Sequence, residues 1–479
     1  MSFNLSAGVY TREVNQSNVI AGVGDSVGAI VIQANQGIAD ERVLVTNNKQ
    51  FVDTFGEPSN LSMLSALAFL GSANRLYVVR KTLDATAATI NVDDSGAGVT
   101  FAMTARGGGV YGNDISYTLA ATGDADIFEL VIFYKAVEVE TFNISKTVGK
   151  VDGFGKSVYM EQAVNDVSAY VVIADTTANT NNPAVVGTAT SLAGGSDDTA
   201  APATNDIIAG YDLFLVRDEV EVSLLINAGW AEPSIKTNMV SIAEARKDCI
   251  ALLDTTYNDT IGAMVTEAGT INSTYAAMYG PWIYAYDQYH DTYNYLPPSG
   301  YVAGSFASTA LNDEVWYAVA GSRRGVLNVS GVEFTLTEGE RDLLYAANVN
   351  PIQQFFGDGI QIYGQKTLTS TPSALDRINV RMLMIKISKA MNVSLKPFVF
   401  EINDSFMRDN ITSIISNYLE DIKVRRGLTD FGVVCDTTNN TPVVIDQNKL
   451  IIDIYIKPSR VAEFIRVNAI VTASGISLS

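Results

Sequence analysis

Two kinds of apolar pattern alternate in the first part of this chain, and their order limits the folds that it can adopt. Ser26 to Gln33 is a short apolar run typical of a strand, and Leu76 to Arg80 is a second one. Between them, Leu61 to Leu70 repeats leucines at helical spacing and stops at Gly71, which predicts a capped helix. This strand–helix–strand order is typical of an α/β unit.

The pattern changes between about Leu83 and Thr204. This segment is rich in Thr, Ala, Gly, Asp and Val, and its alternating runs, such as Ile127 to Tyr134 and Val137 to Phe142, are separated by Gly- and Asp-rich turns. Short strands at close spacing with little helix predict a β-sandwich or barrel-like insertion.

The α/β pattern returns after Gly210. We expect a strand over Tyr211 to Val216, a helix over Glu219 to Ala228, a buried strand over Cys249 to Asp254 and another strand over Pro281 to Tyr286. The chain therefore predicts one α/β body that is interrupted by a β-rich domain.

The last quarter of the chain alternates strands with capped helices. Ser373 and Asp376 form the pattern of a capping box for a helix over Ala374 to Met391. Asp404 precedes a second helix, in which one apolar stripe is made by Ile411, Ile414, Ile415, Tyr418, Leu419 and Ile422.

Charge and composition exclude several classes of protein. The chain has 52 acidic and 32 basic residues and a net charge of −20, which argues against binding to nucleic acid or to anionic lipid. No apolar run approaches the length of a membrane span, and the start MSFNLSAG lacks the pattern of a signal peptide. Cys249 and Cys435 are interpreted as core thiols of a reducing compartment. We expect folding in cytoplasm and no direct membrane insertion.

The sequence offers no recognisable catalytic, metal-binding or cofactor-binding set. His290 is the single histidine, and no G-x-S-x-G elbow accompanies it, so an α/β hydrolase remains an alternative without a motif. Gly149 to Ser157 approaches a phosphate-binding loop but places Lys150 where the first glycine belongs, which favours a turn. We expect no enzyme activity and no cofactor.

Eight segments together resemble a known family, the contractile tail sheath proteins of long-tailed phages and related contractile injection particles. They keep the family's order over nearly the whole chain, and the resemblance is weakest in the insertion. The segments are Gly8 to Val14, Tyr111 to Ile115, Tyr279 to Trp282, Pro297 to Gly304, Asn348 to Ile352, Gly359 to Leu368, Arg377 to Met384 and Pro458 to Phe464.

The resemblance implies a multi-domain sheath fold of the α/β (α+β) class. It is expected to have an α/β body, an inserted β-sandwich-like domain that faces outward, an inner C-terminal domain and extended strand arms at both ends. The bounds that we expect are 1–20 for the N-terminal arm, 21–85 with 205–456 for the body (residues from about 359 forming the inner domain), 86–204 for the insertion and 457–479 for the C-terminal arm.

The resemblance also implies a structural role. Subunits of the family stack as hexameric rings around an inner tail tube and contract from a metastable extended lattice, which drives the tube through the host envelope. The expected partners are further copies of the chain, the tube protein, and baseplate and tail terminator proteins, in a virion tail that is assembled in host cytoplasm. A passive surface-layer or capsid-like protein, which assembles but never contracts, is the alternative.

The resemblance further implies that subunits are linked by strand exchange of the two arms. Along Phe464 to Thr472, apolar residues alternate with Arg466 and Asn468, as in a strand with one apolar face. The alternative is that both ends pack on their own body. The expected interface residues are Val9, Tyr10, Thr11, Arg12, Glu13, Val14, Ile465, Val467, Ala469 and Val471.

Lys423, Arg425 and Arg426 are our candidates for the contact with the tube. They concentrate positive charge at the end of one helix in an acidic chain, and could therefore face an acidic tube. The alternative is an ordinary helix C-terminus, where cations are favourable.

Overall fold

The structure is a computed structural model that describes residues 24, 26–464 and 466. The described residues form two compact units, which we call the large unit, Gly24–Ile385, and the C-terminal unit, from Lys386 onward. The division falls within helix α10 (Ile378–Leu395). Each unit is described by itself.

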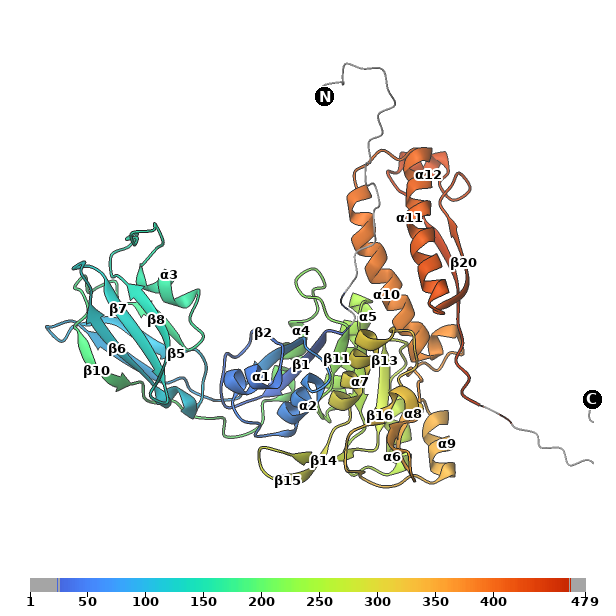
Figure 1. The fold of residues 1–479 in the computed structure, drawn as a ribbon, viewed down its shortest axis with the longest axis horizontal. Coiled ribbons are helices and arrows are strands. Elements are labelled where there is room, and N and C mark those ends of the chain that lie inside the picture. The colour runs from blue at the N-terminus through green and yellow to red at the C-terminus, as the bar shows by residue number, and fades with distance from the viewer. Residues whose placement is uncertain (1–23, 25, 465, 467–479) are drawn as a thin grey trace, which may run out of the picture. The chain divides into compact units, whose positions relative to one another are not determined.

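A nine-stranded sheet forms the centre of the large unit (Figure 1), in the order β16-β19-β18-β13-β12-β11-β1-β3-β2. The six strands from β18 to β3 are parallel, and β2, β19 and β16 join antiparallel to their neighbours. The strands are β1 (Gly28–Gln33), β2 (Arg42–Val45), β3 (Leu76–Lys81), β11 (Leu224–Ile226), β12 (Ile250–Asp254), β13 (Ala276–Gly280), β16 (Val326–Leu327), β18 (Val349–Phe355) and β19 (Gly359–Ile362).

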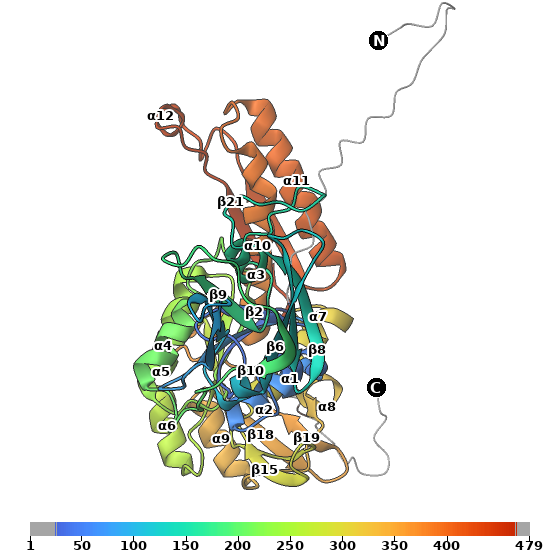
Figure 2. The ribbon, with the colours of Figure 1, turned by 90° about the vertical axis from the view of Figure 1, so that its left-hand side faces the viewer.

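Helices cover both faces of this sheet, which explains why the central strands are continuous apolar runs. One face packs against α4 (Thr204–Asp212), α5 (Pro233–Arg246), α6 (Ile261–Gly269) and α9 (Glu338–Ala346). The other packs against α2 (Leu61–Leu70) and α7 (Ser299–Asn312). Figure 2 shows α4, α5 and α6 stacked along one side of the unit. The short helix α1 (Asn48–Phe55) precedes α2.

Several sequence predictions are confirmed here. Strands β1, β3 and β12 and helix α2 lie where they were expected. The side chain of Asn60 accepts hydrogen bonds from the N–H groups of Ser62 and Met63 at the start of α2, and Gly71 ends the helix. Local apolar spacing and capping residues were sufficient to define these elements.

Two predictions in this region were wrong, the strand over Tyr211 to Val216 and the helix over Glu219 to Ala228. Tyr211 belongs to α4, where it is fully buried with Ile207 one turn earlier, and its hydroxyl donates to the carbonyl of Ile226 at 2.6 Å. The predicted helix over Glu219 to Ala228 is instead the central strand β11 with irregular flanks. Its short apolar run is buried between β1 and β12, and such runs do not distinguish strand from helix by periodicity.

The Pro297-to-Gly304 motif brings α7 against α2. Pro298 stands at the N-cap of α7. A Cβ on Gly300 would lie 2.4 Å from the carbonyl oxygen of Ser65, whereas one on Gly304 would lie 3.2 Å from Cβ of Ser72. Of these two glycines, Gly300 makes the closer approach to the neighbouring backbone.

The predicted insertion is a two-sheet sandwich, which confirms the β-sandwich-like part of the fold class. Its sheets share one apolar core, to which Phe101, Leu119 and Leu130 contribute. One sheet has the order β10-β6-β7-β8 and the other β4-β5-β9. The elements are β4 (Thr89–Asp93), β5 (Val99–Ala105), β6 (Ile115–Ala121), β7 (Phe128–Tyr134), β8 (Val137–Ile144), α3 (Met160–Asn165), β9 (Val171–Asp175) and β10 (Val186–Ser191).

Arg80 of β3 joins the sandwich to the sheet. Its side chain is fully buried, and its guanidinium donates to the carbonyls of Ala34 and Gly108, both at 2.6 Å, and to that of Gly37. Ala34 and Gly37 follow β1, whereas Gly108 belongs to the insertion. One buried cation therefore satisfies backbone groups on both sides of the joint.

The two crossings of the chain at this joint are also tied to each other. Asp198 accepts hydrogen bonds from the N–H groups of Leu83, Asp84 and Ala85, at 2.8 to 2.9 Å. A Cβ on Gly109 would lie 2.1 Å from the carbonyl oxygen of Asn35. A glycine is therefore needed at this position, because the backbone of the insertion here approaches the backbone that follows β1.

In the C-terminal unit, α11 (Ser405–Val424) lies alongside β20 (Leu428–Val434), as Figure 1 shows. The side chain of Asp404 accepts from the N–H of Met407 and caps α11, as predicted. Of the predicted stripe, Ile411, Ile415, Leu419 and Ile422 are buried, and Ile414 and Tyr418 are partly exposed. The remaining elements are η3 (Lys396–Phe398), α12 (Pro442–Asp446) and β21 (Asp453–Pro458).

The capping box predicted at Ser373 is wrong. Ser373 caps the short turn η2 (Ala374–Asp376) by accepting from the N–H of Leu375, and α10 begins only at Ile378. Arg377 is extended because it forms an antiparallel bridge with Lys366. A long-range backbone pairing thus interrupts a segment whose local pattern is helical.

Candidate assembly surfaces

The residues predicted for strand exchange lie outside the described residues. This applies to the interface residues named in both arms, so strand exchange stays a prediction, as do the predicted domain bounds. The residues concerned are Val9, Tyr10, Thr11, Arg12, Glu13, Val14, Ile465, Val467, Ala469 and Val471.

The C-terminal unit presents an open hairpin of two strands. β20 and β21 pair antiparallel, with Phe431 opposite Ile456 and Val433 opposite Ile454, and within the described residues neither pairs with another strand. These apolar side chains are only partly buried, and Tyr455 is 64% exposed. A two-stranded sheet is marginally stable alone, and its outer backbone groups are available to further strands.

Lys423, Arg425 and Arg426 lie at the end of α11, as predicted, but acidic residues lie close to two of them. Lys423 Nζ is 3.6 Å from a carboxylate oxygen of Glu420 and 3.9 Å from one of Asp430, and Arg425 Nε is 3.2 Å from Asp421. Arg426 is exposed, has a left-handed φ of 67°, and makes no ion pair in the described part of the chain. The neighbouring carboxylates neutralise part of the positive charge of this surface. Among its three cations, the charge of Arg426 is the least neutralised by the described residues.

An exposed apolar loop precedes the other end of α11, and sequence analysis did not single it out. Its side chains are largely exposed, and Phe400 is 104% exposed with a φ of 74°. The sequence does carry a sign of this loop, because residues 397–402 (P-F-V-F-E-I) form a largely apolar segment between two helical ones. We define the apolar loop as Val399, Phe400 and Ile402 together with Phe406 in the first turn of α11.

A group of tyrosines covers one face of the hairpin β14 (Ile283–Asp287) and β15 (Thr292–Leu296) in the large unit. Ring centroids lie 4.9 Å apart for Tyr284 and Tyr295, 5.4 Å for Tyr284 and Tyr293, and 5.2 Å for Tyr286 and Tyr293. Three of these rings are exposed to more than a third. Exposed aromatic surface of this kind is typical of interaction sites.

The polar cluster at the end of β12 bears on the hydrolase alternative, because ligands of open α/β sheets bind beyond the carboxyl ends of the strands. There Asp254 accepts from the N–H and hydroxyl of Ser299, at 2.6 and 2.7 Å, and from the N–H of Gly229 at 2.9 Å. Asp254 and Ser299 are fully or almost fully buried. The carboxylate therefore anchors the start of α7 instead of facing a cleft.

Burial raises the pKa of Asp254 to about 6, although the hydrogen bonds from Ser299 and Gly229 and the charge of Lys236 act in the opposite direction. Because the folded state then holds the proton more tightly than the unfolded chain, the contribution of Asp254 to stability is complete below the ordinary pKa of 3.8. It is lost as the pH rises through about 6.

His290, the single histidine of the chain, lies on the surface. Its side chain is 53% exposed, and Nδ1 is 2.7 Å from the buried carboxylate of Asp287. Neither Ser299 nor Asp254 forms a hydrogen bond with it among the described residues. The structure thus brings together no Ser–His–Asp set in the part that it describes.

The described residues contain no group of His, Cys, Asp and Glu side chains that could hold a metal ion. No helix among them has both the length and the apolar character needed to cross a membrane. Cys249 and Cys435 are buried, as predicted, and neither forms a disulfide in the described part of the chain.

Comparison with protein families identifies the chain. Residues 200–368 match the phage tail sheath protein central domain, and residues 370–472 match the phage tail sheath C-terminal domain, together more than half of the sequence. The chain belongs to the phage tail sheath family. The predicted resemblance is thereby confirmed. The match to the central domain includes those strands of the nine-stranded sheet that follow β10 in sequence, and the match to the C-terminal domain includes β20 and β21.

Curated sheath proteins are similar over long stretches. The tail sheath protein of Enterobacteria phage T4 is 36% identical over 309 residues, which cover 59% of this chain and 47% of that protein. The tail sheath protein of Vibrio phage KVP40 is 31% identical over 390 residues, covering 75% and 57%. The chain thus spans about half the length of the curated relatives that it matches.

Solved sheath structures share the fold. The sheath tail protein of Listeria innocua aligns with a TM-score of 0.63 at 15% identity, covering 91% of this chain and 93% of that one. The contracted PVC sheath complex of an extracellular contractile injection system aligns with a TM-score of 0.60 at 16% identity and covers 99% of both chains. The α/β fold class predicted for a sheath protein is confirmed.

Proposed function

We propose that this chain is the sheath subunit of a contractile tail. In this proposal, copies stack as hexameric rings around an inner tube and shorten from a metastable extended lattice, which drives the tube through the host envelope. The protein acts in the virion tail, after assembly in host cytoplasm, through protein contacts with the tube, the baseplate and the tail terminator. It needs no cofactor and carries out no catalysis.

The observation that carries this proposal is the open hairpin β20–β21 in a chain of the sheath family. Its two strands are seven and six residues long. The predicted exchange segments, residues 9–14 and 465–471, have matching lengths. We propose that these segments, supplied by neighbouring copies, pair with the two open edges, so that backbone hydrogen bonds link the subunits and alternate side chains set the register.

The exposed apolar surfaces supply a driving force for contraction without ATP. The apolar loop and the tyrosines of β14–β15 are available for burial between subunits. A few hundred Å² of additional apolar burial per subunit would stabilise the short lattice by roughly 5–10 kcal/mol. This value is an upper bound, because ordering of side chains and arms costs part of it.

Electron microscopy of the purified protein at rising concentration tests the proposal. We expect hollow helical tubes built from ring-like repeats, wider than a bare tail tube. Two lattices with different rise, in the presence and absence of a tube, would separate a contractile sheath from a passive surface-layer or capsid-like protein. A single lattice under all conditions would contradict contraction.

Deletion of Met1 to Gln16 tests the arms. We expect the truncated chain to keep its fold, because the residues of the sheet, the sandwich and the C-terminal unit are all retained, but to lose ordered tubes. Circular dichroism serves as the control for folding. Unchanged assembly and contraction of the truncated chain would refute strand exchange by the N-terminal arm.

A further inference from the structure

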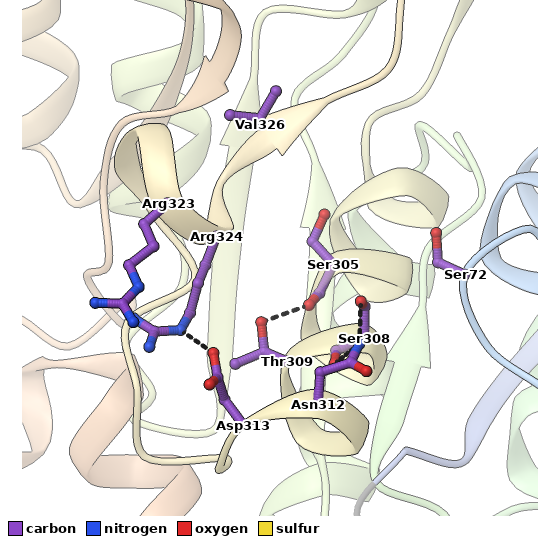
Figure 3. Close-up of a pocket in the computed structure, with 9 residues that line it drawn as sticks. All are labelled: Ser72, Ser305, Ser308, Thr309, Asn312, Asp313, Arg323, Arg324 and Val326. Carbon is purple, nitrogen blue, oxygen red and sulfur yellow. Dashed lines mark hydrogen bonds and ion pairs between the residues drawn. The ribbon is translucent and has the colours of Figure 1, made fainter.

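A polar pocket of about 330 Å³ lies in the large unit between the C-terminal half of α7 and the short helix α8 (Gly321–Arg324). Figure 3 shows the side chains of Arg323 and Arg324 next to each other on one side and Ser305, Thr309 and Asn312 of α7 on the other. At about 30 Å³ per water molecule, its volume equals that of roughly ten waters. It can therefore admit a whole polar side chain.

Some hydrogen-bond donors in this pocket already donate to groups of the same helix, whereas others are available to a ligand. The hydroxyls of Ser305 and Thr309 donate to helix carbonyls, at 3.1 and 2.8 Å. The hydroxyl oxygen of Ser308 accepts from the amide of Asn312 at 3.2 Å, which leaves the Ser308 O–H as a donor. Ser72 contributes a further hydroxyl to the lining.

Arg323 and Arg324, the two arginines of the pocket, also differ in how far neighbouring groups hold them in place. Nε of Arg324 donates to Asp313 at 2.6 Å, and its guanidinium lies 4.3 Å from the ring centroid of Tyr317, so one side of this group is held in place. Arg323 is exposed, and no ion pair to it is found in the part of the chain that the structure describes. The pocket thus contains two cations, one nearby carboxylate and spare hydroxyl donors, and this set favours an oxyanion.

We propose that the pocket binds a carboxylate side chain of a second copy of this chain, a proposal that rests on the proposed sheath function. Charge complementarity selects this occupant, because each copy carries 52 acidic and 32 basic residues and so presents carboxylates in excess. The fork of Arg323 can bind both carboxylate oxygens, with Ser308 and the remaining N–H groups of Arg324 at the sides. Subunits of an acidic assembly that would otherwise repel one another gain a specific contact here.

Assembly measurements test the energetic importance of this contact. Arg323→Ala should raise the protein concentration needed for tube formation about tenfold, the change expected for the loss of one charge-assisted contact. Arg323→Lys keeps the charge but loses the fork, so it should fall between the wild type and the alanine variant. Arg217→Ala, at an exposed arginine elsewhere in the large unit, is the control and should leave the threshold unchanged. An Arg323→Ala threshold equal to that of the wild type would overturn the proposal.

A crosslinking experiment identifies the occupant. A carbodiimide joins an amine to a carboxylate in direct contact, so Arg323→Lys places a reactive amine in the pocket. Mixing ordinary and ¹⁵N-labelled copies before crosslinking lets mass spectrometry distinguish links between copies from links within one chain. We expect a link from position 323 to an acidic residue of another copy, and none from Arg217→Lys. A link confined to Asp313 of the same chain, or no link, would overturn the proposal.

The same samples separate this proposal from the proposed function and from a free anion. Tubes without the link between copies would refute the pocket contact alone, whereas the link without tubes would support the pocket and count against the sheath lattice. Titration with inorganic phosphate covers the other source of an oxyanion. Phosphate binding with a Kd below about 1 mM that Arg323→Ala abolishes, with the assembly threshold unchanged, would show a site for a free anion and overturn the carboxylate assignment.

Discussion

Arg80→Met is the most direct test of how the sandwich is attached to the sheet. The substitution keeps a long side chain at a fully buried position of β3 but removes every donor. It leaves the carbonyls of Ala34, Gly37 and Gly108 without the guanidinium that they now share. We therefore expect the loss of both stability and coupling between the two parts.

The magnitude follows from the three carbonyls. A buried acceptor left without a partner costs about 1–3 kcal/mol, so three would cost about 3–9 kcal/mol if no water entered. Methionine also avoids the desolvation cost of a buried guanidinium, which offsets part of this loss. We expect a net decrease of about 3–5 kcal/mol in the free energy of unfolding.

Chemical denaturation and limited proteolysis measure the two consequences separately. The three tryptophans, Trp230, Trp282 and Trp316, all lie outside the sandwich, so their fluorescence reports unfolding of the sheet region. Far-UV circular dichroism reports the whole chain. In Arg80→Met we expect the fluorescence and circular dichroism transitions to occur at different denaturant concentrations. We also expect protease cleavage to increase at residues 83–86 and 196–204, where the chain crosses the joint.

Arg217→Met provides the matched control, since it makes the same chemical change at an exposed position. It should change stability by less than about 0.5 kcal/mol. If Arg80→Met also costs less than about 1 kcal/mol, with coincident transitions and unchanged cleavage, water can replace the guanidinium and the reasoning is refuted.

Three further predictions concern other parts of the structure. Gly300→Ala should lower the free energy of unfolding by about 1–3 kcal/mol, because the new Cβ meets backbone of α2, and denaturation that leaves stability unchanged would contradict that packing. Asp254→Asn removes a group whose folded pKa is about 6, so the wild type should lose roughly 1–3 kcal/mol relative to the variant between about pH 4 and pH 7. If the free energies of unfolding of the wild type and the variant change in parallel over this pH range, Asp254 does not titrate within it. Reversing the charge of Arg425 and Arg426 to glutamate should reduce cosedimentation with the tube but not sheath-only assembly, and equal cosedimentation would remove this surface as a tube contact.

Local sequence patterns were sufficient wherever an element is defined by its own residues. The leucine spacing and Gly71 stop of α2, the Asp404 cap of α11 and the alternation in β7 and β8 all involve residues close to one another in sequence. Their physical causes, apolar periodicity and capping hydrogen bonds, are short in range. The same holds for the family resemblance, which depends on the order of short motifs.

Patterns failed where a distant segment decides the backbone. Tyr211 is helical because its ring fills the core and its hydroxyl reaches Ile226, and β11 is a strand because two neighbours enclose it. Arg377 leaves the helical pattern through its bridge to Lys366. In each case a contact remote in sequence outweighs a local preference.

The sequence by itself therefore determined the α/β class, the β-rich insertion and the membership of the sheath family. Only the tertiary structure decided that Arg80 joins the insertion to the sheet, that β20 and β21 pair with no further strand among the described residues, and that α7 and α8 form a pocket with two arginines. The reason is physical. Composition and periodicity act through neighbouring residues, whereas buried charges, open edges and pockets arise from segments that folding alone brings together.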